Sequence, residues 1–160
     1  MHPLRVLFVC TGNTCRSPMA AGLFRTLAAK HPAFAGRALH VSSAGTAASE
    51  GAPAAALAVE AMRAKGIDIS DHRARSFKDD GEPYDLILTM TEEHKAQVLL
   101  RRPECAANIY TLKEYAGISG SKDIPDPFGL GSEAYRRAID EIESAVRGAI
   151  ERLAAERGKR

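Results

Sequence analysis

The sequence contains no long hydrophobic run, only three cysteines and almost no excess of either charge. No apolar segment approaches the roughly 18 residues that span a bilayer, and the first residues lack the apolar core of a signal peptide. We therefore expect a cytoplasmic protein that does not contact a membrane. The net charge of +2, from 22 basic and 20 acidic residues, argues against nucleic acid as a partner.

The few cysteines exclude two further classes of protein. Cys10 and Cys15 lie in one short segment and Cys105 stands alone, which is too few for the disulfide framework of a small secreted protein. No Cys-x-x-Cys pair with a matching pair of histidines is present, so a zinc site is not expected. We expect neither a metal nor a cofactor.

Apolar runs typical of strands alternate with helical patterns along the chain. The strands are predicted over residues 4–9, 39–43, 84–90 and 108–112. Helices are predicted over residues 18–28, 57–62 and 135–153, and a further helix is predicted to start after the cap Thr91, with Glu92 and Glu93 in its first turn. This alternation indicates the α/β class, with a four-stranded parallel sheet flanked by helices in a three-layer sandwich. A single domain over residues 1–160, a frayed basic tail from about residue 155 and a monomer are expected.

The segment between the first strand and the first helix carries the strongest functional signal. It reads Cys10-Thr11-Gly12-Asn13-Thr14-Cys15-Arg16-Ser17 and precedes Pro18. Ligands of parallel sheets bind beyond the carboxyl ends of the strands, where this segment lies. Gly12 permits a positive φ and Asn13 tolerates one, so that backbone N–H groups can turn inward and form a nest for an oxyanion. Ser17 is expected to cap the helix, with Pro18 at its first position.

Cys10 and Arg16 give this loop, residues 10–17, a specific chemistry. The planar guanidinium of Arg16 can hold two phosphate oxygens at once, and the positive end of the following helix adds to the same field. A cysteine held as thiolate in such a field is a nucleophile. The other common phosphate motifs, GxxxxGK[ST] and GxGxxG, are absent. The loop is therefore predicted to bind a phosphoryl group and to attack it.

At these residues the sequence resembles the low-molecular-weight protein tyrosine phosphatase family, and the resemblance covers nearly the whole chain. The matching stretches are residues 9–20, 43–45, 72–75 and 126–128. The resemblance implies that Cys10 is the nucleophile, that Arg16 binds phosphate and that Asp126 is the general acid. It also implies a hydrogen-bonded network that shapes the loop, formed by Asn13, Ser17, Ser43 and His72.

Asp126 would be a weaker candidate without the resemblance. Asp-Pro pairs usually serve turns, and Asp123 is a second carboxylate nearby. The position of Asp126 after the fourth strand favours it, because the carboxyl ends of parallel strands meet at one sheet edge. Phe128 is expected to line the substrate pocket, and Arg75 to be an ion-pair partner.

Within the family, the sequence is more similar to the branch that removes phosphate from arginine. Thr14 stands where tyrosine phosphatases usually carry an aliphatic residue, and its hydroxyl can pair with a guanidinium N–H. The predicted reaction is hydrolysis of phosphoarginine in proteins through a cysteinyl-phosphate intermediate. Three alternatives stay open: phosphotyrosine hydrolysis, non-catalytic phosphate binding, and thioredoxin-coupled arsenate reduction, which needs more resolving cysteines than Cys105 provides.

Cys15 allows two interpretations that the sequence does not separate. It is either a small packing residue of the loop or a thiol that traps oxidised Cys10 as a disulfide and so prevents overoxidation.

Overall fold

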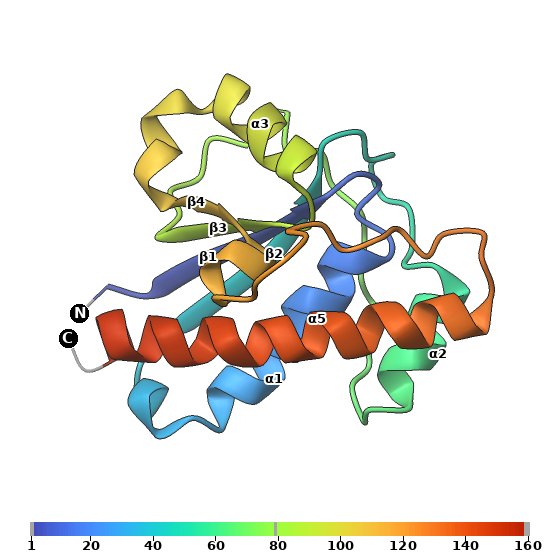
Figure 1. Cartoon of the computed structure of the whole chain (residues 1–160), viewed down its shortest axis with the longest axis horizontal. Helices are drawn as coiled ribbons and strands as arrows, with labels where there is room; N and C mark the ends of the chain where they lie inside the picture. Colours follow the sequence, from blue (N-terminus) through green and yellow to red (C-terminus); the bar gives the residue numbers. More distant parts are fainter. Residues whose placement is uncertain (1, 79, 159–160) are drawn as a thin grey trace.

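The computed structural model describes residues 2–78 and 80–158 of the chain, and it contains one parallel sheet with helices on both faces (Figure 1). The strands pair in the order β2-β1-β3-β4, and their bounds are β1 Leu4–Cys10, β2 Leu39–Gly45, β3 Leu86–Thr89 and β4 Ile109–Thr111. The α-helices are α1 Arg16–Ala29, α2 Ala56–Arg63, α3 Glu92–Arg101, α4 Leu112–Tyr115 and α5 Ser132–Leu153. Shorter helical turns are η1 Pro32–Phe34, η2 Pro103–Asn108 and η3 Ala154–Gly158. The predicted four-stranded α/β fold is confirmed.

The two faces of the sheet bury different layers, as the alternation of side chains along β1 requires. Leu4, Val6 and Phe8 belong to the larger cluster, which α1 and α5 cover. Leu7 and Val9 point to the opposite face and belong to a smaller cluster beneath α3. Figure 1 shows α3 on one side of the sheet and α1 with α5 on the other. The three-layer arrangement is therefore also confirmed.

The long closing helix supplies much of the larger cluster. Its buried residues recur at helical spacing and include the whole stripe expected from the sequence: Tyr135, Ala138, Ile139, Ile142, Val146, Ala149, Ile150 and Leu153. Each large aliphatic side chain buried in this way stabilises the fold by about 1.5–3 kcal/mol. This stripe holds α5 against α1 and thereby fixes the first turn of α1, where the loop ends.

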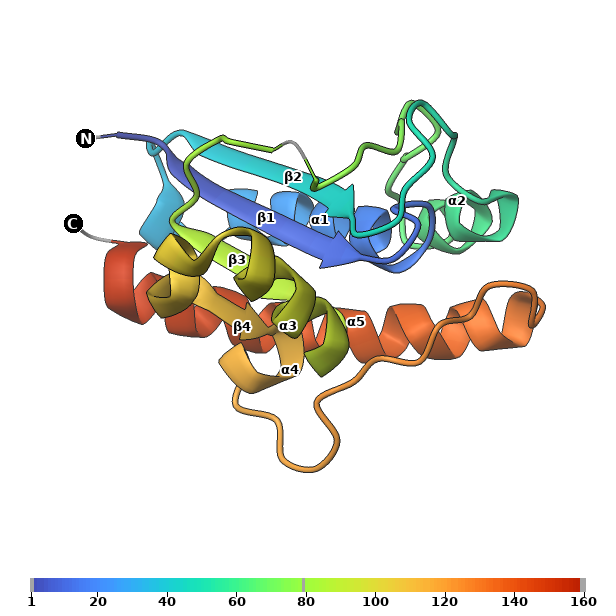
Figure 2. The ribbon, with the colours of Figure 1, turned by 90° about the horizontal axis from the view of Figure 1, so that it is seen from above.

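The functional loop lies where the strand order switches. From β1 the chain passes to β2 on one side, and β3 pairs with β1 on the other side, so a crevice opens beyond the carboxyl end of β1. Figure 2 shows that β1 and β2 point to the same end of the molecule, where the chain turns back into α1. Cys10 is the last residue of β1 and therefore stands at this crevice.

The start of α1 differs from the prediction. The helix begins at Arg16, and Cys15 is its N-cap without a side-chain capping bond. Ser17 does not cap the helix because its hydroxyl is held by the side chains of Cys10 and Asn13. Pro18 is the third helical residue rather than the first, and it is tolerated there because the first-turn N–H groups lack intrahelical partners in any case.

Other boundaries also differ from the sequence-based expectation; for example, β3 spans Leu86–Thr89 rather than residues 84–90. β4 ends at Thr111 rather than residue 112, because Thr111 and Glu114 form a reciprocal capping box that starts α4. From the sequence we expect a frayed tail from about residue 155. This expectation is wrong for residues 155–158, because the chain is helical as far as Gly158. Arg157 also donates to the carboxylate of Asp85 at 3.2 Å. Residues 159–160 lie outside the described ranges.

The end of β2 approaches the loop so closely that only glycine fits. A Cβ atom on Gly45 would lie 2.3 Å from the carbonyl oxygen of Thr11, a backbone atom that cannot easily move. We expect Gly45→Ala to lower the free energy of unfolding by about 1–3 kcal/mol, the usual cost of overpacking. Urea titration measures this change.

Gly81→Ala is the matched control, because a Cβ there would have no heavy atom within 4 Å. Equal stability of the two variants would show that the contact between Gly45 and Thr11 does not constrain the loop.

Candidate active site

Most of the predicted site residues meet in one pocket of about 220 Å³ at the carboxyl end of β1, whereas Asn13, Ser17, Ser43 and His72 do not line it. It is lined by Cys10, Thr11, Gly12, Thr14, Cys15, Arg16, Asp126 and Phe128, all of which were candidates from the sequence. The loop and the Asp-Pro segment between α4 and α5 form its walls, so residues more than 100 positions apart in the chain face each other there.

Asn13 holds the loop in shape from inside. It is fully buried and has a φ of +58°, the left-handed conformation that asparagine tolerates. Gly12, for which we expect a positive φ from the sequence, is not among the residues with one. The Asn13 side-chain oxygen accepts a hydrogen bond from the Arg75 N–H at 3.0 Å. This fixes the orientation of the amide, because only its oxygen can accept from an N–H.

The fixed amide of Asn13 in turn orients Ser17. The Asn13 Nδ2 group donates to Ser17 Oγ at 2.8 Å and to Ser43 Oγ at 2.9 Å. Ser17 Oγ lies 2.9 Å from Cys10 Sγ. Because Ser17 accepts from Asn13, its own proton is free to point at the sulfur. The network therefore presents a hydrogen-bond donor to Cys10, as stabilisation of a thiolate requires.

His72 fastens the backbone of the same turn. Its Nε2 lies 2.6 Å from the carbonyl oxygen of Asn13, and because a carbonyl can only accept, Nε2 carries the proton. Burial lowers the pKa of His72, although the bond to Asn13 acts in the opposite direction. The imidazole is thus a neutral donor at neutral pH. Asn13, Ser17, Ser43 and His72 are connected as the resemblance implied.

The loop backbone offers donors rather than acceptors to the pocket. Three carbonyl groups of the loop each accept a hydrogen bond from a backbone N–H outside it, at 2.9 Å. The N–H groups of residues 11–15 have no acceptor among the described residues. Together with the start of α1, this arrangement is a nest for an anion.

Arg16 and Asp126 stand at the other wall of the pocket. Arg16 Nη1 donates to the Ile124 carbonyl at 2.8 Å, which fixes the guanidinium plane. Its Nη2 lies 3.7 Å from Asp126 Oδ2. The Arg16 side chain is 6% exposed whereas that of Asp126 is 52% exposed, so the cation is rigidly buried and the carboxylate can reach incoming molecules. The second Asp126 oxygen accepts from the Phe128 N–H at 3.1 Å.

Asp123 and Arg75 have structural roles. Asp123 Oδ1 accepts a hydrogen bond from the Glu92 N–H at 2.9 Å and so stabilises the start of α3. Arg75 pairs with Asp80 at 2.8 Å, as expected of an ion-pair partner. The Asp123 carboxylate, the alternative to Asp126 as general acid, therefore binds the start of α3 instead.

Cys15 is buried between the loop and α5. Its sulfur lies 3.1 Å from the Tyr135 hydroxyl, and burial raises the pKa of the Cys15 thiol. Burial likewise raises the pKa of Tyr135. Both groups therefore remain protonated at neutral pH. Tyr135 belongs to the apolar stripe of α5, and no signal in the sequence indicated its contact with the loop.

The described residues offer neither a metal-binding cluster nor a membrane-spanning helix. Within residues 2–78 and 80–158, no three His, Cys, Asp or Glu side chains are grouped so that they could hold a metal ion. Over the same ranges, no helix is long and apolar enough to cross a membrane.

Comparison with known proteins identifies the family. The model of the family "Low molecular weight phosphotyrosine protein phosphatase" matches residues 5–159. The chain belongs to this family. A protein-arginine-phosphatase from Geobacillus stearothermophilus is 39% identical, with 96% of this chain and 99% of the relative covered. The expected family resemblance is thereby confirmed.

Solved structures agree with the assignment. A low molecular weight protein tyrosine phosphatase from T. tengcongensis has a TM-score of 0.84 and 43% identity, covering 94% of this chain and 99% of that one. A YwlE arginine phosphatase mutant with a phosphorylated active-site serine has a TM-score of 0.85 and 36% identity, covering 97% and 99%.

His94 is a neighbour of the phosphatase loop whose contact the sequence did not reveal. It is buried near the start of α3, and its Nε2 lies 2.8 Å from Thr11 Oγ1. Burial, with the nearby charge of Arg16, lowers the pKa of His94 to about 4. The only signal in the sequence was its position three residues after the helix cap Thr91, which places it beyond the carboxyl end of β3.

The lowered pKa of His94 makes the fold sensitive to acid. The unfolded chain takes up a proton near pH 6.5, whereas folded His94 does so only near pH 4. The free energy of unfolding should therefore fall as the pH drops through this window, by about 3 kcal/mol from this residue. His72, whose pKa is also lowered, acts in the same direction.

Urea titrations at several pH values test this expectation. His94→Gln removes the titrating group while keeping a partner for Thr11, so its stability should decrease less steeply between pH 6.5 and 4. His40→Gln is the control, because the His40 side chain is exposed. An unchanged slope in His94→Gln would contradict the assignment.

Proposed function

We propose that this chain hydrolyses phosphoarginine in proteins through a cysteinyl-phosphate intermediate. The observation that carries the proposal is that Cys10, Arg16, Asp126 and Thr14 line a single pocket. A nucleophile, a phosphate-binding cation, an acid and a polar wall are thereby combined. The arginine phosphatases among its relatives support the choice of substrate.

The first step transfers the phosphoryl group to sulfur. The Cys10 thiolate, with the Ser17 hydroxyl donating to it, attacks phosphorus as the P–N bond breaks. Arg16 and the free N–H groups of the loop stabilise the negative oxygens in the transition state. Asp126 donates a proton to the departing guanidine nitrogen, since an unprotonated guanidine is a poor leaving group. Such general-acid help is worth about 10²–10⁴-fold.

The second step releases phosphate. Asp126, now a carboxylate, removes a proton from a water molecule that attacks phosphorus, and the S–P bond breaks with its electron pair returning to Cys10. The hydrogen bond from Ser17 then stabilises the departing thiolate. The exposure of Asp126 suits this exchange, because water can approach its carboxylate directly.

Thr14 is the basis for arginine specificity. Its carbonyl oxygen is fixed by the Ala55 N–H at 2.9 Å, and it lines the same pocket as Asp126 and Phe128. A guanidinium offers N–H donors to the Thr14 hydroxyl and to the carbonyl oxygen of the protonated Asp126 carboxyl group, whereas a phenyl ring offers none.

Phosphotyrosine is the alternative substrate, and one observation favours it. Phe128 lines the pocket and is 68% exposed, and Leu130 is exposed to the same extent. An exposed aromatic ring can stack on the phenyl group of a tyrosine as well as on a guanidinium. The choice between the two substrates therefore depends on the Thr14 hydroxyl rather than on Phe128.

We place the protein in the cytoplasm, where Cys10 stays reduced, and we propose that it acts as a monomer on phosphorylated proteins. A single chain provides every residue that lines the pocket.

The proposal is tested with peptides that carry either phosphoarginine or phosphotyrosine. Wild type should have the higher kcat/KM with phosphoarginine, and Cys10→Ser should show no turnover. Thr14→Ile should shift the ratio of the two kcat/KM values toward phosphotyrosine by about tenfold, which corresponds to one hydrogen bond with a charged group.

Thr26→Ile makes the same chemical change on α1, outside the pocket, and should leave the ratio unchanged. A wild type that prefers phosphotyrosine would disprove the substrate. A wild type that hydrolyses neither peptide would leave phosphate binding or arsenate reduction.

Redox protection by Cys15 is also a proposal. Cys10 and Cys15 line the same pocket, so we propose that peroxide oxidises Cys10 to a sulfenic acid. The Cys15 sulfur then attacks the Cys10 sulfur and displaces its hydroxyl group, which leaves with the Cys15 proton as water and gives a Cys10–Cys15 disulfide. After mild peroxide and then dithiothreitol, wild type should regain activity, whereas Cys15→Ser should not. Disulfide formation should accelerate with rising pH, because the raised pKa keeps Cys15 protonated near neutrality.

Cys105→Ser is the control and should behave as wild type, since Cys105 is buried in the other cluster. Mass spectrometry that finds sulfinic Cys10 in wild type and no bond to Cys15 would disprove the protective role.

A further inference from the structure

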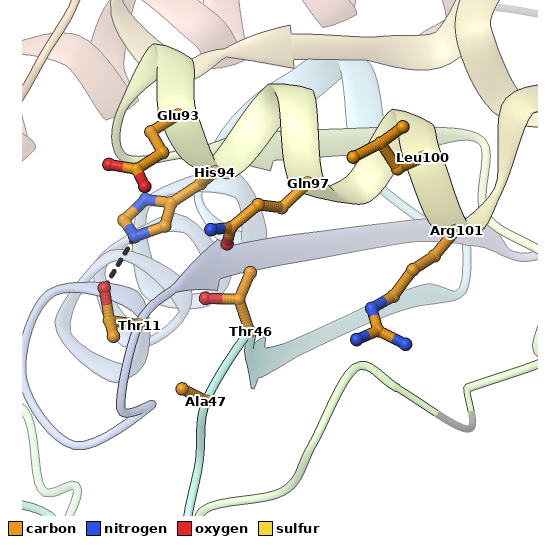
Figure 3. A pocket seen from close by; sticks show the side chains of 8 residues that line it. All are labelled: Thr11, Thr46, Ala47, Glu93, His94, Gln97, Leu100 and Arg101. Atoms are coloured by element: carbon orange, nitrogen blue, oxygen red, sulfur yellow. Dashed lines mark hydrogen bonds between the residues drawn. The ribbon is translucent and has the colours of Figure 1, made fainter.

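A second, larger hollow adjoins the catalytic pocket. It has a volume of about 550 Å³ and lies between α3 and the segment that follows β2 (Figure 3). Its lining residues are Thr11, Thr46, Ala47, Glu93, His94, Gln97, Leu100 and Arg101. We call it the α3 groove. Thr11 lines both hollows, so the two hollows are neighbours on either side of this residue.

Three polar side chains of the α3 groove have no protein partner among the described residues. Glu93, Gln97 and Arg101 form no side-chain hydrogen bond or ion pair within the described ranges, whereas Lys95 on the same helix does. Lys95 pairs with Glu114 at 2.9 Å, and Arg102, just after the helix, pairs with Glu104 at 3.0 Å. These three side chains are therefore available to a ligand in the groove.

The base of the groove is joined to the catalytic loop. His94 is 5% exposed, and its Nδ1 has no hydrogen-bond partner in the described part of the chain. Its Nε2 contacts Thr11, as the dashed line in Figure 3 shows. The figure also shows Gln97 and Arg101 extending from the side of α3 on which Thr46 and Ala47 lie. The groove is therefore a polar channel that begins at the rim of the catalytic pocket.

We propose that the α3 groove binds the polypeptide on one side of the phosphorylated residue. This inference rests on the proposed protein phosphatase function. Glu93 and Arg101 are eight residues apart on the helix, about 12 Å along its axis. An extended peptide covers that length in about four residues. A substrate would thus pass Glu93 first, Gln97 midway and Arg101 last.

The charges of the groove define the sequence that it favours. Glu93 lies beside His94 at the catalytic end and would pair with a basic residue close to the phosphoarginine. Arg101 would pair with an acidic residue about four positions further along. Gln97, between them, can donate to and accept from the peptide backbone. The expected ligand is therefore an extended segment with a basic residue near the phosphoarginine and an acidic one beyond it.

A charge-exchange experiment tests the groove. Phosphoarginine peptides are prepared with Glu or with Lys four positions from the phosphoarginine, on either side of it. On the preferred side, wild type should hydrolyse the Glu peptide with a kcat/KM about two- to fivefold higher than the Lys peptide, the effect of one exposed ion pair. Arg101→Glu should reverse this preference, and hydrolysis of free phosphoarginine should stay unchanged.

Arg63→Glu is a matched control, because Arg63 is an exposed residue that ends α2 as Arg101 ends α3. It should keep the wild-type preference. Equal rates for the Glu and Lys peptides on both sides would disprove peptide binding in the α3 groove. A reversal by Arg63→Glu as well would disprove it too. Failure of wild type to hydrolyse free phosphoarginine and every phosphoarginine peptide would instead overturn the proposed function.

Discussion

The buried side chain of Asn13 is the constraint on which the site depends. Its amide is oriented by the backbone N–H of Arg75. This orientation obliges Ser17 to accept from Asn13 and leaves the Ser17 proton free to point at Cys10. Each buried bond lost from such a network costs about 1–3 kcal/mol, because its partner is left unsatisfied. The left-handed backbone of Asn13 is strained unless several bonds hold it. The chemistry of Cys10 therefore depends on a residue that does not line the pocket.

Two segments outside the loop, β2 and residues 72–76, hold this network in place. β2 brings Ser43 to Asn13 and ends at Gly45, the one residue small enough to pass Thr11. The isolated bridge between Gly45 and Ser76 keeps the segment with His72 and Arg75 against the loop. These contacts join parts of the chain that are far apart in sequence. Disruption of β2 or of residues 72–76 would therefore free the backbone of the loop to change its conformation.

The sequence allowed the sheet, the family and the pocket residues to be predicted, because strand alternation and the loop motif are local patterns. It did not reveal contacts that depend on where distant elements meet. The bond between Tyr135 and Cys15 arises because an apolar helical stripe happens to end at the loop, and the His94–Thr11 bond because two parallel strands end side by side. Ser17 was misassigned as a helix cap because its tertiary partners outweigh its local preference.

The burial of the charged groups explains how one pocket can bind an anion and also exchange protons. Arg16 is enclosed and fixed by the Ile124 carbonyl, so its field acts on phosphate without reorganisation during the reaction. Asp126 stands on a turn and is half exposed, so it can contact the leaving group in one step and water in the next. Exchanging these environments would weaken both functions, because an exposed Arg16 would be screened by solvent and a buried Asp126 could not reach water. The difference in exposure between the two residues is therefore a requirement of the two-step reaction.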